Sequence, residues 1–314
     1  METIVKNNSG TDLKRKTIHG VSWTTVTQIM KQMSQFIITA ILARLLAPSD
    51  FGVLGMAAVF TNFAYSMNEI GFGTALIQKQ DAKEEHYSSA FWMNALLGVV
   101  LMGVIYLCAP LISTFYNIPK LKPIISILSI NFFIASLSIV FKNKIVREMD
   151  FKTLGFIEFS TIFCAGCCGM YFALTGHGVW SLVYQQLIFT SLTFVCYWFS
   201  SSWKPTMRVS KKAINDLFNF SAHMTGSTII HYLSRNLDYL LIGKFLGDSA
   251  LGYYSLAYKL MMYPIQNITW VISGVLFPAF SQIQHDMRKV RAAYQKIVKA
   301  ISLITFPMMA GLFV

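Results

Sequence analysis

Polar and charged side chains recur at helical spacing inside two long apolar stretches of the chain. The first set comprises Gln28, Lys31 and Gln35, and the second comprises His231, Arg235 and Asp238. Spacings of three and four residues place each set on one face of a helix. A charged side chain at the centre of a bilayer costs about 3 kcal/mol, so it normally faces a bundle interior or a water-filled cavity. The two faces therefore predict a polar cavity that can bind a substrate.

Two neighbouring apolar stretches add charged residues that can line the same cavity. Glu69 lies on a polar stripe of the second stretch, and Lys259 lies on the corresponding stripe of the eighth. The basic residues of the cavity would be Lys31, Arg235 and Lys259. Glu69 and Asp238 would oppose them and are candidates for ion coupling, so the attraction for anions is modest and local. The alternative is that these polar groups only hydrogen-bond helix to helix.

Glu158 and Arg147 are candidates of a different kind. Glu158 stands in the fifth apolar stretch without an obvious partner in the sequence. It fits either a proton or cation site or, in the interpretation we favour, the membrane interface near Lys152. Arg147 lies in the basic loop 142–152, which is typical of anchoring beside anionic lipid. A contact between Arg147 and a substrate phosphate at the cytoplasmic mouth is the alternative.

Motifs that would indicate catalysis are missing from the sequence. There is no phosphate-binding loop of the Walker type. Cys164, Cys167 and Cys168 have a metal-like spacing, but no His or further Cys is near them, so we interpret them as helix-packing residues. We expect no enzymatic activity, no metal and no cofactor.

The composition indicates a membrane protein. Hydrophobic residues make up 54% of the 314 residues and charged residues only 13%, about half the share of a soluble domain. The net charge of +12 would favour nucleic acid in a soluble chain. Here the basic residues lie mostly in the loops between apolar stretches, which indicates membrane orientation instead, and we expect no nucleic-acid partner.

The apolar stretches are long enough to be membrane-spanning helices. They cover residues 18–46, 51–77, 88–115, 122–146, 154–175, 178–200, 217–243, 250–280 and 293–314. If the N-terminus is cytoplasmic, 19 Lys and Arg residues fall on the inside and four on the outside. The positive-inside rule therefore predicts a cytoplasmic N-terminus.

A repeat divides the chain into two lobes. Residues 242–257 repeat the pattern of residues 42–57 with a shift of 200, which aligns Gly252 with Gly52. Six helices separate the two copies, so both hairpins face the same way, as in transporters built from parallel repeats. The sequence thus predicts an all-α, polytopic membrane protein with a parallel two-lobe repeat.

The predicted domains follow from this repeat. They are a cytoplasmic arm at 1–17, a six-helix N-lobe at 18–200, a basic cytoplasmic linker at 201–216 and a three-helix part of a C-lobe at 217–314. The last apolar stretch has no helix stop signal at Val314. We expect the second lobe to be completed by further residues.

Six segments of the chain carry a resemblance to a known family: Gly20–Trp23, Ala43–Gly52, Glu69–Gln78, Arg147–Lys152, Gly178–Leu182 and Leu251–Ala257. In these segments the chain resembles the Wzx-type polysaccharide flippases of the multidrug/oligosaccharidyl-lipid/polysaccharide exporter superfamily. The resemblance covers nearly the whole chain, and it is greatest to exporters of the O-antigen, colanic-acid and teichuronic-acid pathways.

The resemblance implies two six-helix lobes around a cationic cavity in the bacterial cytoplasmic membrane. It implies that the cargo is an undecaprenyl-diphosphate-linked oligosaccharide, moved to the outer leaflet by alternating access. Lys31, Arg235 and Lys259 would contact the diphosphate or acidic sugars. Membrane lipid and polysaccharide polymerase or chain-length machinery would be the partners.

Three other functions remain open from the sequence. A cation-coupled multidrug antiporter would need an acidic site, for which Glu69 and Glu158 are the candidates in the N-lobe. A polysaccharide polymerase or ligase would need a large outward loop, whereas the predicted outward loops are short. A purely structural membrane subunit is disfavoured by the buried polar faces.

Overall fold

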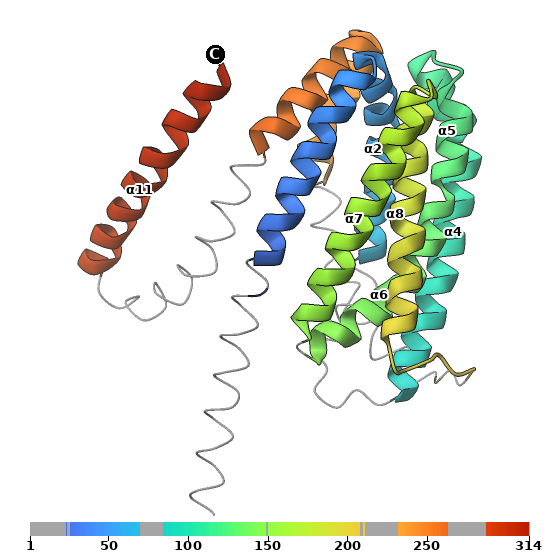
Figure 1. Cartoon of the computed structure of the whole chain (residues 1–314). Coiled ribbons are helices and arrows are strands. Elements are labelled where there is room, and N and C mark those ends of the chain that lie inside the picture. Colours follow the sequence, from blue (N-terminus) through green and yellow to red (C-terminus); the bar gives the residue numbers. More distant parts are fainter. Residues whose placement is uncertain are drawn as a thin grey trace, which may run out of the picture. The chain divides into compact units, whose positions relative to one another are not determined.

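The computed structural model describes residues 23, 26–69, 84–148, 150–207, 210, 232–262 and 287–313 (Figure 1). Most of these residues are helical, and no strand occurs among them. The all-helical prediction is therefore confirmed for this part of the chain. Residues 1–253 and 254–314 form two compact units, which we describe separately.

Where the structure describes them, the apolar stretches of the sequence are helical, and the stretch 122–146 is divided into two helices. Residues 18–22, 24–25, 70–77, 217–231 and 263–280 of the predicted stretches lie outside the described residues. The helices are residues 26–45, α2 (Pro48–Glu69), α4 (Glu84–Tyr116), α5 (Leu121–Leu128), α6 (Ile130–Arg147), α7 (Phe151–Leu174), α8 (Val179–Ser200), residues 232–245, residues 247–262 and α11 (Met287–Phe313). Among the residues that the structure describes, four helical segments are long and apolar enough to cross a membrane: Glu84–Tyr116, Leu121–Arg147, Phe151–Leu174 and Val179–Ser200. The protein is thus an integral membrane protein, as the composition predicts.

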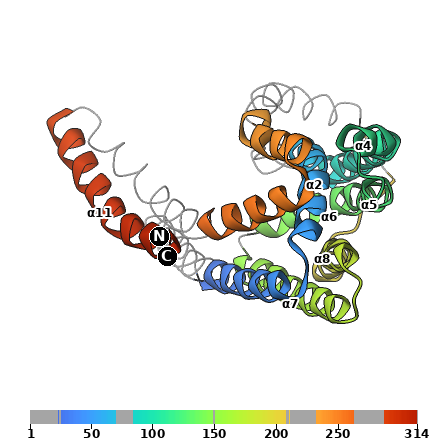
Figure 2. The same ribbon diagram turned by 90° about the horizontal axis from the view of Figure 1, so that it is seen from above.

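Helices α4, α6, α7 and α8 pack into one bundle, seen end-on in Figure 2. Gly98 of α4 lets the backbone approach α6, because a Cβ there would lie 2.1 Å from the Ser136 hydroxyl oxygen. An aromatic cluster closes one end of the bundle, with Phe91, Phe141 and Trp203 in edge or tilted contact at its centre. Such aromatic pairs are worth about 1 kcal/mol each beyond their buried area.

Residues 26–45 run parallel to α7 with glycines at the contact. A Cβ on Gly155 would lie 2.6 Å from Thr27, and a Cβ on Gly166 would lie 2.2 Å from Ile38. The two contacts are 11 residues apart on both helices, so the helices point the same way and share one register. Small residues allow this close backbone approach in membrane helices. The register sets Lys31, one turn after Thr27, beside Glu158, one turn after Gly155.

The two corners aligned by the 200-residue shift touch each other reciprocally. A Cβ on Gly52 would lie 1.7 Å from the carbonyl oxygen of Asp248, and a Cβ on Gly252 would lie 1.8 Å from that of Pro48. Each glycine therefore packs on the residue four positions before the other glycine.

The expected linker 201–216 begins as a fixed segment. Thr206 shares a 3.0 Å hydrogen bond with Ser88, and the indole of Trp92 donates to the Thr206 carbonyl at 2.9 Å. The backbone N–H of Ser210 donates to the Ser89 hydroxyl at 3.0 Å. These contacts hold the segment against the first turns of α4.

Candidate functional site

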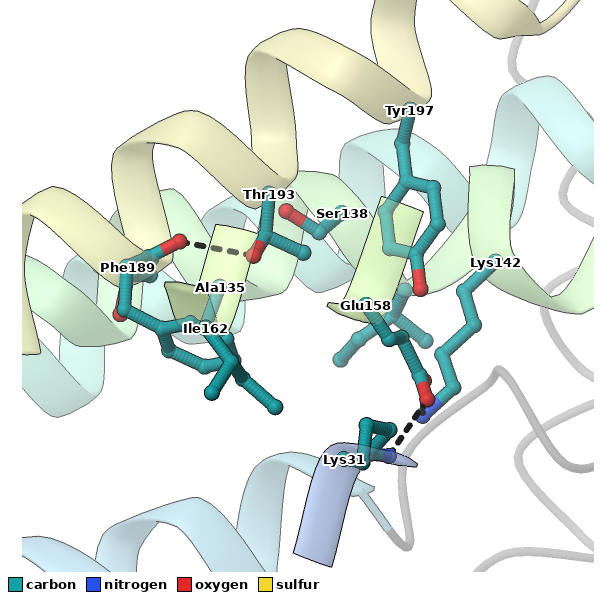
Figure 3. A pocket seen from close by; sticks show the side chains of 11 residues that line it. Lys31, Ala135, Ser138, Lys142, Glu158, Ile162, Phe189, Thr193 and Tyr197 are labelled. Carbon is teal, nitrogen blue, oxygen red and sulfur yellow. Dashed lines mark hydrogen bonds and ion pairs between the residues drawn. The ribbon is translucent and has the colours of Figure 1, made fainter. Parts of the chain in front are cut away.

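A cavity of about 350 Å³ lies within the bundle and contains two of the predicted site residues (Figure 3). Four helices line it: residues 26–45, α6, α7 and α8. The lining side chains are Lys31, Ala135, Ser138, Ile139, Lys142, Glu158, Ile162, Phe189, Thr190, Thr193 and Tyr197. The walls are mostly apolar, and the charges gather at one end.

Glu158 is the centre of the charged end. One carboxylate oxygen, Oε2, accepts a hydrogen bond from Lys31 Nζ at 2.6 Å. The other, Oε1, lies 3.6 Å from Lys142 Nζ. The phenol of Tyr197 points toward the same carboxylate (Figure 3). Each carboxylate oxygen therefore faces a different lysine.

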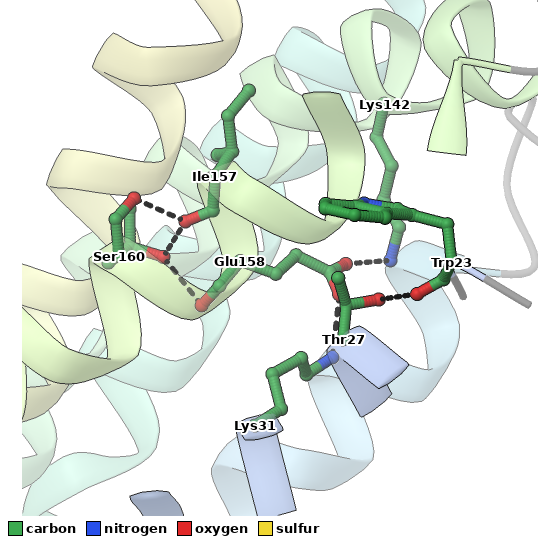
Figure 4. Close-up of polar contacts among 8 residues, drawn as sticks. Trp23, Thr27, Lys31, Lys142, Ile157, Glu158 and Ser160 are labelled. Carbon is green, nitrogen blue, oxygen red and sulfur yellow. Dashed lines mark hydrogen bonds and ion pairs between the residues drawn. The ribbon is translucent and has the colours of Figure 1, made fainter. Parts of the chain in front are cut away.

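Figure 4 shows the contacts of Glu158 with Lys31 and Lys142, and local structure accounts for their convergence. Asp150 caps α7, because its Oδ1 accepts the N–H of Thr153 at 3.1 Å. Lys142 lies eight residues before this cap on α6, and Glu158 lies eight residues after it on α7. The short turn between α6 and α7 therefore places Lys142 and Glu158 at the same level along the two helices. Lys31 completes the cluster through the register fixed at Gly155.

The cluster has an excess of positive charge. Two ammonium groups surround one carboxylate, which gives a formal charge of +1. The side chains of Lys31 and Glu158 are 22% and 20% exposed, whereas Lys142 is 45% exposed. Charges this far from water need partners, since an unpaired ion in a low-dielectric interior is costly. Lys142, the most open of the three, is the first that an incoming ligand would meet.

The serine and threonine hydroxyl groups of the cavity hydrogen-bond within their own helices. Ser138 donates to Ile134 O at 3.1 Å, and Thr193 donates to Phe189 O at 2.7 Å. Thr190 similarly donates to the carbonyl of Gln186. Among the described lining residues, the lysines and the phenol of Tyr197 therefore supply the hydrogen-bond donors for a ligand.

This arrangement suits an anion. Ammonium groups make short, strong hydrogen bonds to phosphate and carboxylate oxygens. A cation entering the same space would meet two ammonium groups for one carboxylate. Within the described ranges no group of three or more His, Cys, Asp or Glu side chains is placed to hold a metal ion.

Three of the predicted residues lie on the same bundle but outside the cavity lining. Gln28 is half-buried and Gln35 is exposed, both on the helix that carries Lys31. Arg147 lies elsewhere, where its Nη1 donates to the Tyr87 hydroxyl at 3.0 Å and its guanidinium stands 6.0 Å from the Tyr87 ring centre. Arg147 thus has an aromatic partner in the bundle.

The predicted residues of the second lobe are not brought to this cavity by any described contact. Arg235 is exposed and Asp238 half-buried on the helix 232–245. Lys259 belongs to the unit 254–314, which is described by itself. His231 lies outside the described residues, and Glu69 ends α2 with its side chain outside them.

Three residues of this bundle were not selected as site candidates from the sequence. Lys142 was assigned to a loop, but α6 continues to Arg147 and carries Lys142 on the stripe 135, 138, 139 and 142. Tyr197 lies on a similar stripe of α8 at 190, 193 and 197. Those helical spacings were the available signal. Asn94 of α4 is completely buried, and its amide has no hydrogen-bond partner in the described structure.

Known proteins similar to this chain act in polysaccharide biosynthesis. Over 303 residues it is 29% identical to the teichuronic acid biosynthesis protein TuaB of Bacillus subtilis (strain 168), and over 304 residues 27% identical to the lipopolysaccharide biosynthesis protein WzxC of Escherichia coli (strain K12). Each match covers 96% of this chain and 62% of the relative. The succinoglycan biosynthesis transport protein ExoT of Rhizobium meliloti (strain 1021) is 26% identical, over 93% of this chain and 59% of its own length.

The chain therefore spans about three fifths of the length of these relatives. No solved structure matches it. Residues 41–314 match the family described as polysaccharide biosynthesis protein. This match over most of the sequence establishes that the chain belongs to the polysaccharide biosynthesis protein family.

Proposed function

We propose that the protein is a flippase that moves undecaprenyl-diphosphate-linked oligosaccharide units across the bacterial cytoplasmic membrane for surface polysaccharide synthesis. The observation that carries this proposal is the cationic cluster of Lys31, Lys142 and Glu158 inside an apolar helical bundle. Ionisable groups at such a position are costly and normally mark a transport path. The names of the relatives, which include a transport protein, support the same function.

The depth of the cluster suits loading from the cytoplasm. Glu158 lies seven residues after Phe151, the first residue of α7, or about 10 Å along the helix. With the N-terminus in the cytoplasm, as the distribution of Lys and Arg predicts, α7 starts on the cytoplasmic side. Lys142 would then make the first contact with the diphosphate and Lys31 the deeper one.

The remaining path would run between two six-helix lobes that alternate between inward and outward access. Its lining would be supplied by the other polar residues predicted from the sequence. They are Gln28, Gln35, Glu69, His231, Arg235, Asp238 and Lys259, with Arg147 near the cytoplasmic mouth. Units delivered to the outer leaflet would pass to the polymerase and chain-length machinery.

The cation-coupled multidrug antiporter is the second candidate, and the cluster argues against it. An antiporter of this kind needs an acidic group that can take a cation. Glu158 instead faces Lys31 and Lys142, so a cation would be repelled by both unless the lysines moved away. Glu69 remains a candidate for ion coupling in the flippase cycle.

The test is complementation of a deletion strain that has no redundant exporter. The complete protein is expressed as wild type, Lys31→Gln or Lys142→Gln, and both the lipid-linked units and the surface polysaccharide are quantified. Each substitution should reduce export about tenfold or more, the scale expected when a charged hydrogen-bond partner of the cargo is lost. The lipid-linked unit should accumulate on the cytoplasmic side.

Lys144→Gln is the matched control. Lys144 lies half a turn away on the same helix and pairs with Glu148 at 3.7 Å instead of facing the cavity. Export should remain close to that of the wild type. Normal surface polysaccharide in the deletion strain would refute the proposed function.

A further inference from the structure

We infer that Lys31 and Lys142 form an anion-binding site and that the Glu158 carboxylate fills this site when no ligand is bound. A phosphate-type headgroup that binds the two lysines would displace the carboxylate. The assignment of the headgroup to a lipid-linked substrate rests on the proposed function. The anion site itself rests on the geometry of the cavity.

The two ion pairs of Glu158 differ in a way that favours exchange. Lys31 makes a short hydrogen bond of 2.6 Å, whereas Lys142 stands at 3.6 Å, beyond ordinary hydrogen-bond distance. An ammonium group has three N–H donors. Lys142 therefore keeps donors for an incoming oxygen while its charge is still partly balanced. An anion can bind Lys142 first and then take over Lys31.

Displacement by Glu158 allows the site to release its bound anion. Two lysines without a carboxylate would have a charge of +2 and would hold a diphosphate tightly. With Glu158 present, one anion replaces another on the same pair of cations. Transport needs binding that is favourable enough for entry and weak enough for exit, and a resident competitor lowers the affinity in this way.

The walls of the cavity indicate what is attached to the anion. Its volume of about 350 Å³ is at the small end of the range for ligand sites, which suits a headgroup better than an oligosaccharide. Ile139, Ile162 and Phe189 line the cavity beside the charged cluster. A phosphate on a hydrocarbon chain meets both surfaces, whereas a free phosphate uses only the charged one.

The test measures anion binding by the complete protein in nanodiscs of phosphatidylcholine. Farnesyl diphosphate and inorganic pyrophosphate are titrated separately by calorimetry, so that a lipid source and a free ion are distinguished. Glu158→Gln should bind farnesyl diphosphate about tenfold more tightly than the wild type, because the competing charge is gone. Lys142→Gln should bind farnesyl diphosphate more weakly than the wild type does. If Glu158→Gln binds pyrophosphate more tightly than the wild type but farnesyl diphosphate no more tightly, the anion site is confirmed but is assigned to a free phosphate.

Transport provides a second readout. Glu158→Gln should lower the turnover of export while lowering the substrate concentration needed for half-maximal rate, because release becomes slow. A residue that only ties helices together would not separate the two quantities. Glu148→Gln, which removes a largely exposed carboxylate paired with Lys144, is the control and should change neither.

The inference is overturned if Glu158→Gln is folded and binds both diphosphates no more tightly than the wild type. If Glu158→Gln does not fold, Glu158→Asp replaces it. The shorter side chain keeps the charge but cannot reach both lysines equally, so affinity should still rise, by less than tenfold, and unchanged affinity overturns the inference. A positive binding result with normal polysaccharide in the deletion strain would reject the proposed function and leave the anion site intact.

Discussion

Replacing Gly52 by alanine tests the contact between the two aligned corners. The added Cβ would lie 1.7 Å from the carbonyl oxygen of Asp248, whereas ordinary contact begins at 3.4 Å. The obstructing atom belongs to the backbone and cannot rotate away, so the two helices must separate by about 1.5 Å. Overpacking of this kind costs about 1–3 kcal/mol, and the better helix propensity of alanine returns about 1 kcal/mol. Because the obstruction is backbone, the cost lies in the upper part of that range, about 2–3 kcal/mol, and we expect a net loss of about 1–2 kcal/mol.

The assay is thermal unfolding of the complete protein in detergent. A loss of this size should lower the melting temperature by about 5 °C, using the scale for domains of about 200 residues. Gly103→Ala is the matched control, since a Cβ there meets nothing within 4 Å in the middle of α4. That variant should melt at or slightly above the wild-type temperature.

Gly252→Ala adds a test of reciprocity. Its Cβ would lie 1.8 Å from Pro48 O, so it should destabilise the protein as much as Gly52→Ala does. The double variant should lose less than the sum of the two, because the same helix pair has already separated. If Gly52→Ala melts as high as Gly103→Ala, or if the two losses add fully, the corners are not in the reciprocal contact described.

Two further experiments test the helical bundle around the cavity. Lys31→Glu or Glu158→Lys alone should lower the melting temperature, because each leaves like charges together. The double variant, in which the two charges are exchanged, should recover part of the loss. If the two losses add fully, Lys31 and Glu158 do not form an ion pair. Asn94→Leu should raise stability by about 1 kcal/mol in the same melting assay, because it replaces a completely buried amide without a partner by an apolar side chain of similar size. A loss of stability would show that the amide is hydrogen-bonded, for example to buried water.

The helical architecture could be predicted from the sequence because membrane-spanning helices are specified locally. The apolar stretch 88–115, for example, became α4, and the stretch 178–200 became α8 with almost the same bounds. The backbone of a helix satisfies its own hydrogen bonds, so length and apolarity decide it without reference to distant residues. The stretch 122–146 became α5 and α6, which follow each other through Ser129, a residue with helical backbone angles, and together form one membrane-length segment.

The site was only partly predictable. Lys31 was selected by helical spacing inside an apolar stretch, and that signal is local. The pairing of Lys31 with Glu158 could not be predicted in this way, because the two residues lie 127 positions apart in the sequence. The carboxylate of Glu158 had no visible partner in the sequence, and the structure places it between Lys31 and Lys142. Its location at the membrane interface stays a prediction. Pairing between distant helices depends on their register, and a single sequence does not record it.

The sequence by itself determined the membrane-embedded helices, the charge distribution along the chain and the repeat that aligns Gly52 with Gly252. Each of these depends on composition or on spacing within one segment. Only the tertiary structure decided which charges meet. Gly155 and Gly166 fix the register of residues 26–45 on α7, and the capped turn at Asp150 sets α6 beside it. Backbone contacts at small residues thus bring Lys31, Lys142 and Glu158 to one end of one cavity.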